Sequence, residues 1–225
     1  MGIWVDSRGW FSESSLCKDR HFAEPYTPDD YKRLSELVKR KFKWEMFQGG
    51  DPNGPIMYAV QSLSDAPVKY HYPLRHHRHE DATMLTLGFL KQFLPDRQLI
   101  IRPHPKFWSQ WTQRLETYKQ NMRKGWTVDQ TPNIYDTLKK CSAVVSVGST
   151  VLTEALALGI PCAALGDGAY TGSESIMECS HAPDKLAKIL SWVPERDKVL
   201  GYLCSIIRDH QIPFGCDSDF IIWLQ

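Results

Sequence analysis

Residues 142–166 read SAVVSVGSTVLTEALALGIPCAALG, and this stretch predicts a strand, a glycine turn, a helix and a second strand in direct succession. Its first part, Ala143 to Val147, is a short apolar run without charge, which is typical of a strand buried on both faces of a parallel sheet. Gly148 breaks the strand, and Ser149 or Thr150 can cap the helix that follows. The stretch therefore predicts an α/β fold, a Rossmann-like parallel sheet flanked by helices.

The turn between this strand and its helix is the first candidate binding site. Ligands of doubly wound sheets bind at the carboxyl ends of the strands, where helix N-termini present N–H groups to anions. Gly148, Ser149 and Thr150 would occupy that place, and their amides and hydroxyls suit a phosphate. Glu154, one turn further on the same helix face, can accept hydrogen bonds from a ribose. The alternative is that Ser149 only caps the helix and that Glu154 only faces solvent.

Two other predicted strands also run into polar residues. Ile56 to Val60 is expected to be the first sheet strand, and Gln61 to Asp65 follow it with an amide, hydroxyls and a carboxylate. Gln98 to Arg102 predicts the next strand, and residues 103–106 after it read PHPK. The rigid, proline-flanked His104 is suited to hydrogen-bond a phosphate or to donate a proton. The alternative is a turn histidine that caps the following helix.

Composition narrows the class of protein. The chain of 225 residues has a formal net charge of only +1, which argues against a general nucleic-acid binder. Residues 1–10 already contain an aspartate and an arginine, so we expect no signal peptide, and no apolar stretch approaches membrane-spanning length. The six cysteines are scattered without paired or zinc-like spacing, so we expect them to be reduced and not nucleophilic. These features predict a cytoplasmic protein.

The chain is expected to divide near residue 55. Residues 1–55 hold an aromatic approach segment and a helix that begins at Thr27-Pro28, and residues 56–225 have the α/β rhythm of one Rossmann-like domain. A cluster formed by His76, His77 and His79 raises the question of a zinc site. It lacks a helix or strand to bring the side chains together, so a surface cluster is favoured and no metal is expected.

These motifs together resemble the bacterial capsule polysaccharide biosynthesis proteins, and in particular their β-Kdo glycosyltransferase domains. The resemblance rests on Gln61…Asp65, on the RPHP run at residues 102–105, on Tyr135-Asp136-Thr137-Leu138, and on SVGSTVLTEALALGIPCAALGDGAY. It extends from about Ile56 to about Pro183, with a weaker likeness at residues 5–9. Each motif is short, and their order and spacing make the likeness specific.

The resemblance implies a GT-B enzyme, in which two Rossmann-like domains face each other and the C-terminal one binds a CMP-sugar. This sequence looks like that C-terminal domain. By resemblance, Glu154 would contact the ribose, and Asp65 would be the catalytic nucleophile or base. The other implied nucleotide-sugar-binding residues are His104, Pro105, Ser146, Gly148, Ser149 and Thr150, with Gln61, Arg102 and Lys106 as secondary candidates.

The implied reaction transfers Kdo from CMP-Kdo, without a metal or other cofactor, to a growing capsular or lipopolysaccharide glycan. The expected partners are the nucleotide-sugar donor, a polysaccharide or glycolipid acceptor, and either a missing N-terminal domain or a second copy. Peripheral association with the inner face of the cytoplasmic membrane also fits. Two alternatives stay open: a transferase or epimerase that uses a UDP- or GDP-sugar, and a nucleotide-binding module without catalysis.

Overall fold

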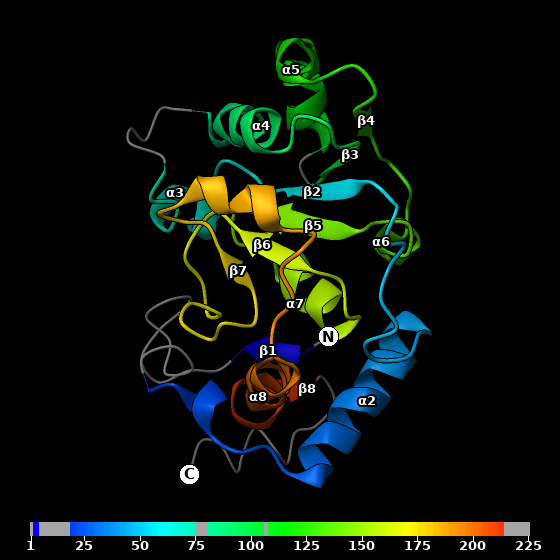
Figure 1. Ribbon diagram of the computed structural model, residues 1–225, viewed down its shortest axis with the longest axis vertical. Coiled ribbons are helices and arrows are strands. Elements are labelled where there is room, and N and C mark those ends of the chain that lie inside the picture. The colour runs from blue at the N-terminus through cyan, green and yellow to red at the C-terminus, as the bar shows by residue number, and fades with distance from the viewer. Residues whose placement is uncertain (1, 5–18, 75–80, 106–107, 214–225) are drawn as a thin grey trace.

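A six-stranded parallel sheet organises the protein in the computed structural model, which describes residues 2–4, 19–74, 81–105 and 108–213 (Figure 1). The strands, in chain order, are β2 (Ile56–Val60), β3 (Leu99–Pro103), β4 (Thr127–Val128), β5 (Ala143–Ser146), β6 (Cys162–Ala164) and β7 (Met177–Glu178). Their spatial order is β4-β3-β2-β5-β6-β7. The order reverses between β2 and β5, as in the classical doubly wound fold, so the predicted Rossmann-like α/β class is confirmed.

Helices cover both faces of this sheet. The α-helices are α2 (Pro28–Phe42), α3 (Ala66–Tyr70), α4 (Ala82–Phe93), α5 (Trp108–Asn121), α6 (Ile134–Leu138), α7 (Thr150–Ala157) and α8 (Arg196–Ser205). Shorter helical turns are η2 (His21–Ala23), η4 (Pro183–Lys188) and the π-helical η5 (Ile206–His210). Outside the main sheet, β1 (Gly2–Trp4) and β8 (Gln211–Pro213) form an antiparallel pair. In Figure 1, α4 and α5 lie above the sheet, and α7, α8 and α2 lie below it.

The sheet separates two hydrophobic cores. Along β2, Met57 and Ala59 belong to the core shared with α2, α7 and α8, whereas Tyr58 and its neighbours on the other face belong to the core under α4 and α5. Every residue of β2 is buried. This burial on both faces explains why the central strands read as continuous apolar runs and not as alternating ones.

Helix α2 begins where the sequence predicted. Thr27 Oγ1 accepts a hydrogen bond from the Asp30 amide, and the Asp30 carboxylate accepts one from the Thr27 amide, which makes a capping box. The helix buries an apolar stripe formed by Leu34, Val38 and Phe42. Tyr31 has the helical spacing of this stripe but is 36% exposed. The capping carboxylate of Asp30 takes the buried position in the first turn instead.

Several boundaries differ from the predicted ones. The strand expected at 98–102 is one residue later, and the strand expected at 143–147 ends at Ser146. Helix α8 runs directly into the π-helical η5, and residues 183–188 form a 3-10 turn. The sequence did not predict α3 or β7. The motif at residues 5–9, the histidine cluster and Lys106 lie outside the described residues.

Helix α2 packs against α8 and shares a core with α7 and the sheet. The proposed division of the chain at residue 55 stays a prediction. Within the part of the chain that the structure describes, no helix combines the length and the apolar character needed to cross a bilayer.

Candidate functional site

The strand register brings the predicted motifs to one edge of the sheet. Val60 pairs with Pro103 on one side, and Ala59 pairs with Ser146 on the other. Gln61, His104 and Gly148 therefore follow three neighbouring strands at nearly the same level. Adjacent strands lie about 4.8 Å apart, so the strand ends that carry His104 and Gly148 are about 10 Å apart with Gln61 between them. This edge is the topological switch point, where doubly wound folds bind ligands.

Gln61 joins the two sides of the switch point. Its Oε1 accepts a hydrogen bond of 2.7 Å from the Gly148 amide and one of 3.3 Å from the Ser146 hydroxyl. The Ser146 hydroxyl is fully buried, and its single hydrogen is shared between Gln61 Oε1 and the nearer acceptor, the Ala59 carbonyl at 2.8 Å. Gln61 therefore fixes the turn after β5 relative to the end of β2. The Gly148 amide, which the sequence offered to a phosphate, is occupied by Gln61.

The turn at Gly148 has room for glycine only. A Cβ atom on this residue would lie 2.9 Å from Pro67 Cβ, which belongs to the rigid ring in the first turn of α3. Ser149 is the N-cap of α7, and its Oγ accepts from the Val151 amide at 3.3 Å. Thr150, the first residue of α7, is exposed. Ser149 therefore caps α7, and the first turn of this helix lies at the switch point, directly after β5.

Asp65 closes a short loop after β2. Its Oδ2 accepts from the Ser62 amide at 3.2 Å, and the Ser62 and Ser64 hydroxyls are 2.8 Å apart. Asp65 is also the N-cap residue of α3, but its side chain makes no capping hydrogen bond. The carboxylate is half-buried at the edge that also carries Gln61. A carboxylate held in this way is oriented by the loop and remains open on one side to solvent.

His104 and Pro105 are exposed beyond the end of β3. A hollow of about 150 Å³ lies beside the histidine, between the ends of β2 and β3 and helix α5. Its lining includes Gln61, Ser62, His104, Trp111 and Arg114. Lys106, the third residue of this predicted motif, lies outside the described residues. His104 is therefore accessible from the same edge as Gln61.

Arg102 points into the protein and has a structural role. Its side chain is only 6% exposed and forms an ion pair with Asp129. It also donates to Thr137 Oγ1 at 3.1 Å and to the Thr131 carbonyl at 2.6 Å. Burial alone would raise the pKa of Asp129, but hydrogen bonds from Thr131, Thr137 and Arg102 lower it to about 2. Arg102, a secondary binding candidate by sequence, thus fastens β3 to the segment between β4 and α6.

Glu154 lies in the middle of α7 and does not simply face solvent. Its Oε1 accepts a hydrogen bond of 2.6 Å from Lys41 Nζ on α2, and its side chain is 21% exposed. The sequence did not single out Lys41 as part of a site, because 113 residues separate it from Glu154. Only the packing of α2 against the sheet brings the two together.

The buried thiols have no features of nucleophiles. Burial raises the pKa of Cys141 and Cys179 to about 12 and that of Cys204 to about 11. Cys162 Sγ lies within the core and its pKa is raised further by burial. Thiolates are therefore scarce at neutral pH. Among the residues that the structure describes, no three His, Cys, Asp or Glu side chains gather as a metal site would require.

Taken together, the edge offers an exposed imidazole, a half-buried carboxylate, an amide-bridged glycine turn and the open first turn of a helix. Anions are stabilised at helix N-termini, and an imidazole can donate a hydrogen bond to a phosphate oxygen. The carboxylates of Asp65 and Glu154 can accept hydrogen bonds from sugar hydroxyls. This combination suits a ligand with both a phosphate and sugar rings.

A protein family described as "Capsule polysaccharide biosynthesis protein" matches residues 47–176, which is more than half of the chain. The matched segment includes β2 to β6 and every described candidate residue of the site. No curated protein matches the chain.

The fold is similar to solved structures at low sequence identity. One is the KpsC beta Kdo 2,7 transferase of Thermosulfurimonas dismutans, with a TM-score of 0.56, 16% identity and 85% of this chain covered. The beta Kdo 2,4 transferase of the same KpsC has a TM-score of 0.48, 16% identity and 82% coverage. The chain spans 57% of the length of each of these two transferases.

Proposed function

This chain belongs to the capsule polysaccharide biosynthesis protein family, and from that premise we propose that it carries the nucleotide-sugar-binding half of a glycosyltransferase that uses CMP-Kdo. In this proposal, Kdo is transferred to a growing capsular or lipopolysaccharide glycan. The acceptor side is completed by an N-terminal domain or by a second copy of the chain. The reaction takes place in the cytoplasm, with peripheral association at the inner face of the membrane.

One observation carries the proposal. Three motifs that lie far apart in the sequence, at Gln61, His104 and Gly148, reach the same level at the one place where the strand order reverses. The edge between β2 and β5 is where the fold itself favours a ligand. The match to a capsule biosynthesis family supports a sugar nucleotide as that ligand. The likeness to a beta Kdo transferase supports the fold in which such a ligand would bind.

The chemistry assigned to the site is the departure of CMP. The bond between the anomeric carbon and the phosphate oxygen breaks, and negative charge develops on the phosphate. His104 and the first turn of α7 stabilise that charge, which is the largest single contribution that a site of this kind can make. Asp65 is placed as the nucleophile at the anomeric carbon or as the base that takes the acceptor hydroxyl proton. A leaving group with a single phosphate lets these residues act without a divalent ion.

Calorimetry with CMP and with UDP tests the donor. Each titration is done with Mg²⁺ and with EDTA. The proposal expects CMP to bind with the same affinity in both conditions and UDP to bind more weakly. Binding of UDP without binding of CMP would refute the Kdo donor and leave a UDP-sugar enzyme. Incubation with CMP-Kdo and a glycan acceptor then separates a complete transferase from a module that binds without turnover.

The His104→Ala variant tests the phosphate contact. We expect CMP affinity to fall by about 1.5–3 kcal/mol, which is the loss of a hydrogen bond to a charged group, while the melting temperature hardly changes. Ser149→Ala should have a smaller effect. His181→Ala is a matched control, because the His181 side chain is 77% exposed and lies beyond β7. A His104→Ala variant that melts early but binds CMP normally would make the histidine structural.

A further inference from the structure

Lys41 connects α2 to the middle of α7. The lysine lies in the last turn of α2, and its Nζ is 2.6 Å from Glu154 Oε1. The Phe42 ring next to it meets the Tyr135 ring edge-on, with 4.6 Å between the centroids, so α6 also contacts this helix end. Residue 41 precedes the segment matched by the family, which begins at residue 47. Lys41 therefore lies outside the region matched by the family, whereas its partner Glu154 lies within it.

The electrostatics of the three side chains favour a fixed arrangement. Burial alone would lower the pKa of Lys41, but the hydrogen bond and charge of Glu154 outweigh it and raise the pKa. Burial raises the pKa of the Tyr135 hydroxyl, which also interacts with the lysine. At neutral pH Lys41 is therefore an ammonium and Tyr135 a neutral phenol. The side chains of Lys41 and Glu154 are 41% and 21% exposed, so solvent still reaches the pair.

This arrangement leaves part of the Glu154 carboxylate for a ligand. The lysine occupies Oε1, and among the described residues Oε2 has no hydrogen-bond partner. A free glutamate side chain samples several rotamers, and each one that binding must fix costs free energy. A glutamate already held by an ion pair at one oxygen loses less freedom when the other oxygen accepts a hydroxyl.

We infer that Lys41 is a positioning residue that holds Glu154 ready to accept hydrogen bonds from the ribose hydroxyls of the bound nucleotide. This inference rests on the proposed function. It goes beyond the proposed function because it assigns a role to Lys41, which acts on the ligand through Glu154 and not by direct contact. The residue sets the preference of the site for ribose over deoxyribose through the carboxylate. The competing explanation is that the ion pair only fastens α2 to α7.

Discrimination between CMP and 2′-deoxy-CMP separates the two explanations. The full chain is titrated with both nucleotides, as wild type and as Lys41→Met, Lys41→Arg, Glu154→Gln and Lys39→Met. Wild type should bind CMP about tenfold more tightly than the deoxynucleotide, as expected for one hydrogen bond to a charged group. Lys41→Met and Glu154→Gln should lose most of this ratio through weaker CMP binding, with the affinity for the deoxynucleotide nearly unchanged.

The other two variants are controls. Lys39 lies on the same helix and pairs with Glu45, but its side chain is 69% exposed, so Lys39→Met should leave the ratio as in wild type. Lys41→Arg keeps the positive charge and should retain much of the ratio. It also keeps the experiment informative if Lys41→Met folds poorly, which circular dichroism would detect.

The outcomes are distinct. An unchanged ratio in Lys41→Met and Glu154→Gln, with CMP still bound, would overturn this inference and leave the proposed function standing. An equal loss of affinity for both nucleotides would also overturn it, because a fastening role predicts that result. A wild-type chain that binds neither CMP nor UDP would refute the proposed function itself.

Discussion

Replacing Gln61 by glutamate tests the switch-point site with almost no change of shape. Among the described residues, Gln61 makes its side-chain hydrogen bonds as an acceptor, through Oε1, from the Gly148 amide and the Ser146 hydroxyl. A glutamate carboxylate can accept the same two hydrogen bonds. Gln61→Glu should therefore fold with a free energy of unfolding close to that of wild type, while it places a negative charge at the centre of the proposed phosphate site.

The expected loss of affinity follows from Coulomb's law. We take about 6 Å as the separation between a carboxylate at position 61 and a phosphate bound at the first turn of α7, because the acceptor atom of residue 61 lies 2.7 Å from the Gly148 amide, just before that turn. At effective dielectric constants of 20–40, two unit charges at that distance repel by about 1.4–2.8 kcal/mol. CMP affinity should therefore fall by about tenfold to a hundredfold. Part of the loss should be recovered in high salt, because salt screens partly exposed charges.

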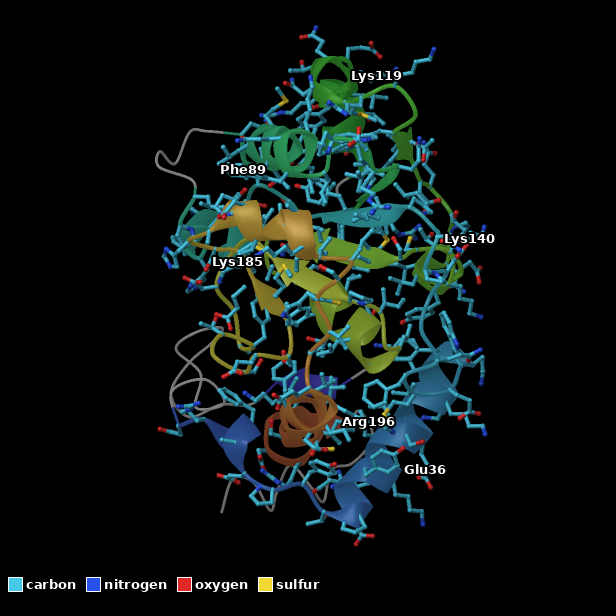
Figure 2. The ribbon with its side chains drawn as sticks, in the orientation of Figure 1. Glu36, Phe89, Lys119, Lys140, Lys185 and Arg196 are labelled. Carbon is cyan, nitrogen blue, oxygen red and sulfur yellow. The ribbon has the colours of Figure 1, made fainter. Side chains whose placement is uncertain are left out.

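Calorimetry with CMP at low and high salt is the assay, together with urea unfolding of the same variant. Gln120→Glu adds the same charge at an exposed position beside Lys119, which Figure 2 places at the outer end of α5. This control should bind CMP as wild type does. A Gln61→Glu variant that binds CMP normally would show that the phosphate lies elsewhere. A variant that loses more than about 1 kcal/mol of stability would show that the hydrogen bonds need the amide.

Two further changes test the structural elements that support the site. Asp129→Asn should lower the free energy of unfolding by about 2–4 kcal/mol at pH 7, because it leaves the buried Arg102 without its negatively charged partner. The pKa of Asp129 in the folded protein, about 2, lies below its ordinary value of 3.8, so this stabilisation is present above pH 4 and is lost as the pH falls toward 2. Urea unfolding should therefore show a smaller difference in stability between wild type and Asp129→Asn at pH 3 than at pH 7. Gly148→Ala should lower the free energy of unfolding by about 1–3 kcal/mol, because the new Cβ would press against Pro67. Gly88 is an exposed position in α4, where a Cβ would have no described atom within 4 Å, so Gly88→Ala should raise the melting temperature.

The sequence predicted what local patterns determine. The apolar runs of β2, β3, β5 and β6 and the helix start at Thr27-Pro28 are properties of a few adjacent residues, and all of them were confirmed. The sequence also indicated which polar residues follow each strand. Because parallel strands end at one edge, this was enough to predict a site at the strand ends.

The features that the sequence did not predict depend on packing between residues far apart in the chain. β7 is only two residues long and pairs with β6 after a polar loop, so no periodicity marks it. The inward orientation of the Arg102 side chain could not be predicted, because its partner Asp129 lies 27 residues further along the chain, after another helix. The same is true of Gln61, whose hydrogen bond to Gly148 spans 87 residues. Contacts of this kind are visible only when the strand order is known.

The central position of β2 has a consequence for the time at which the protein can fold. Ile56 pairs with Leu99 on one side and with Ala143 on the other, 43 and 87 residues further along the chain. A ribosome adds about 5–20 residues per second, so this strand waits about 4–17 s for its second neighbour. During that interval an apolar strand with an unpaired edge is open to wrong partners. The strand that creates the binding edge is therefore the one that a nascent chain would most need a chaperone to shield.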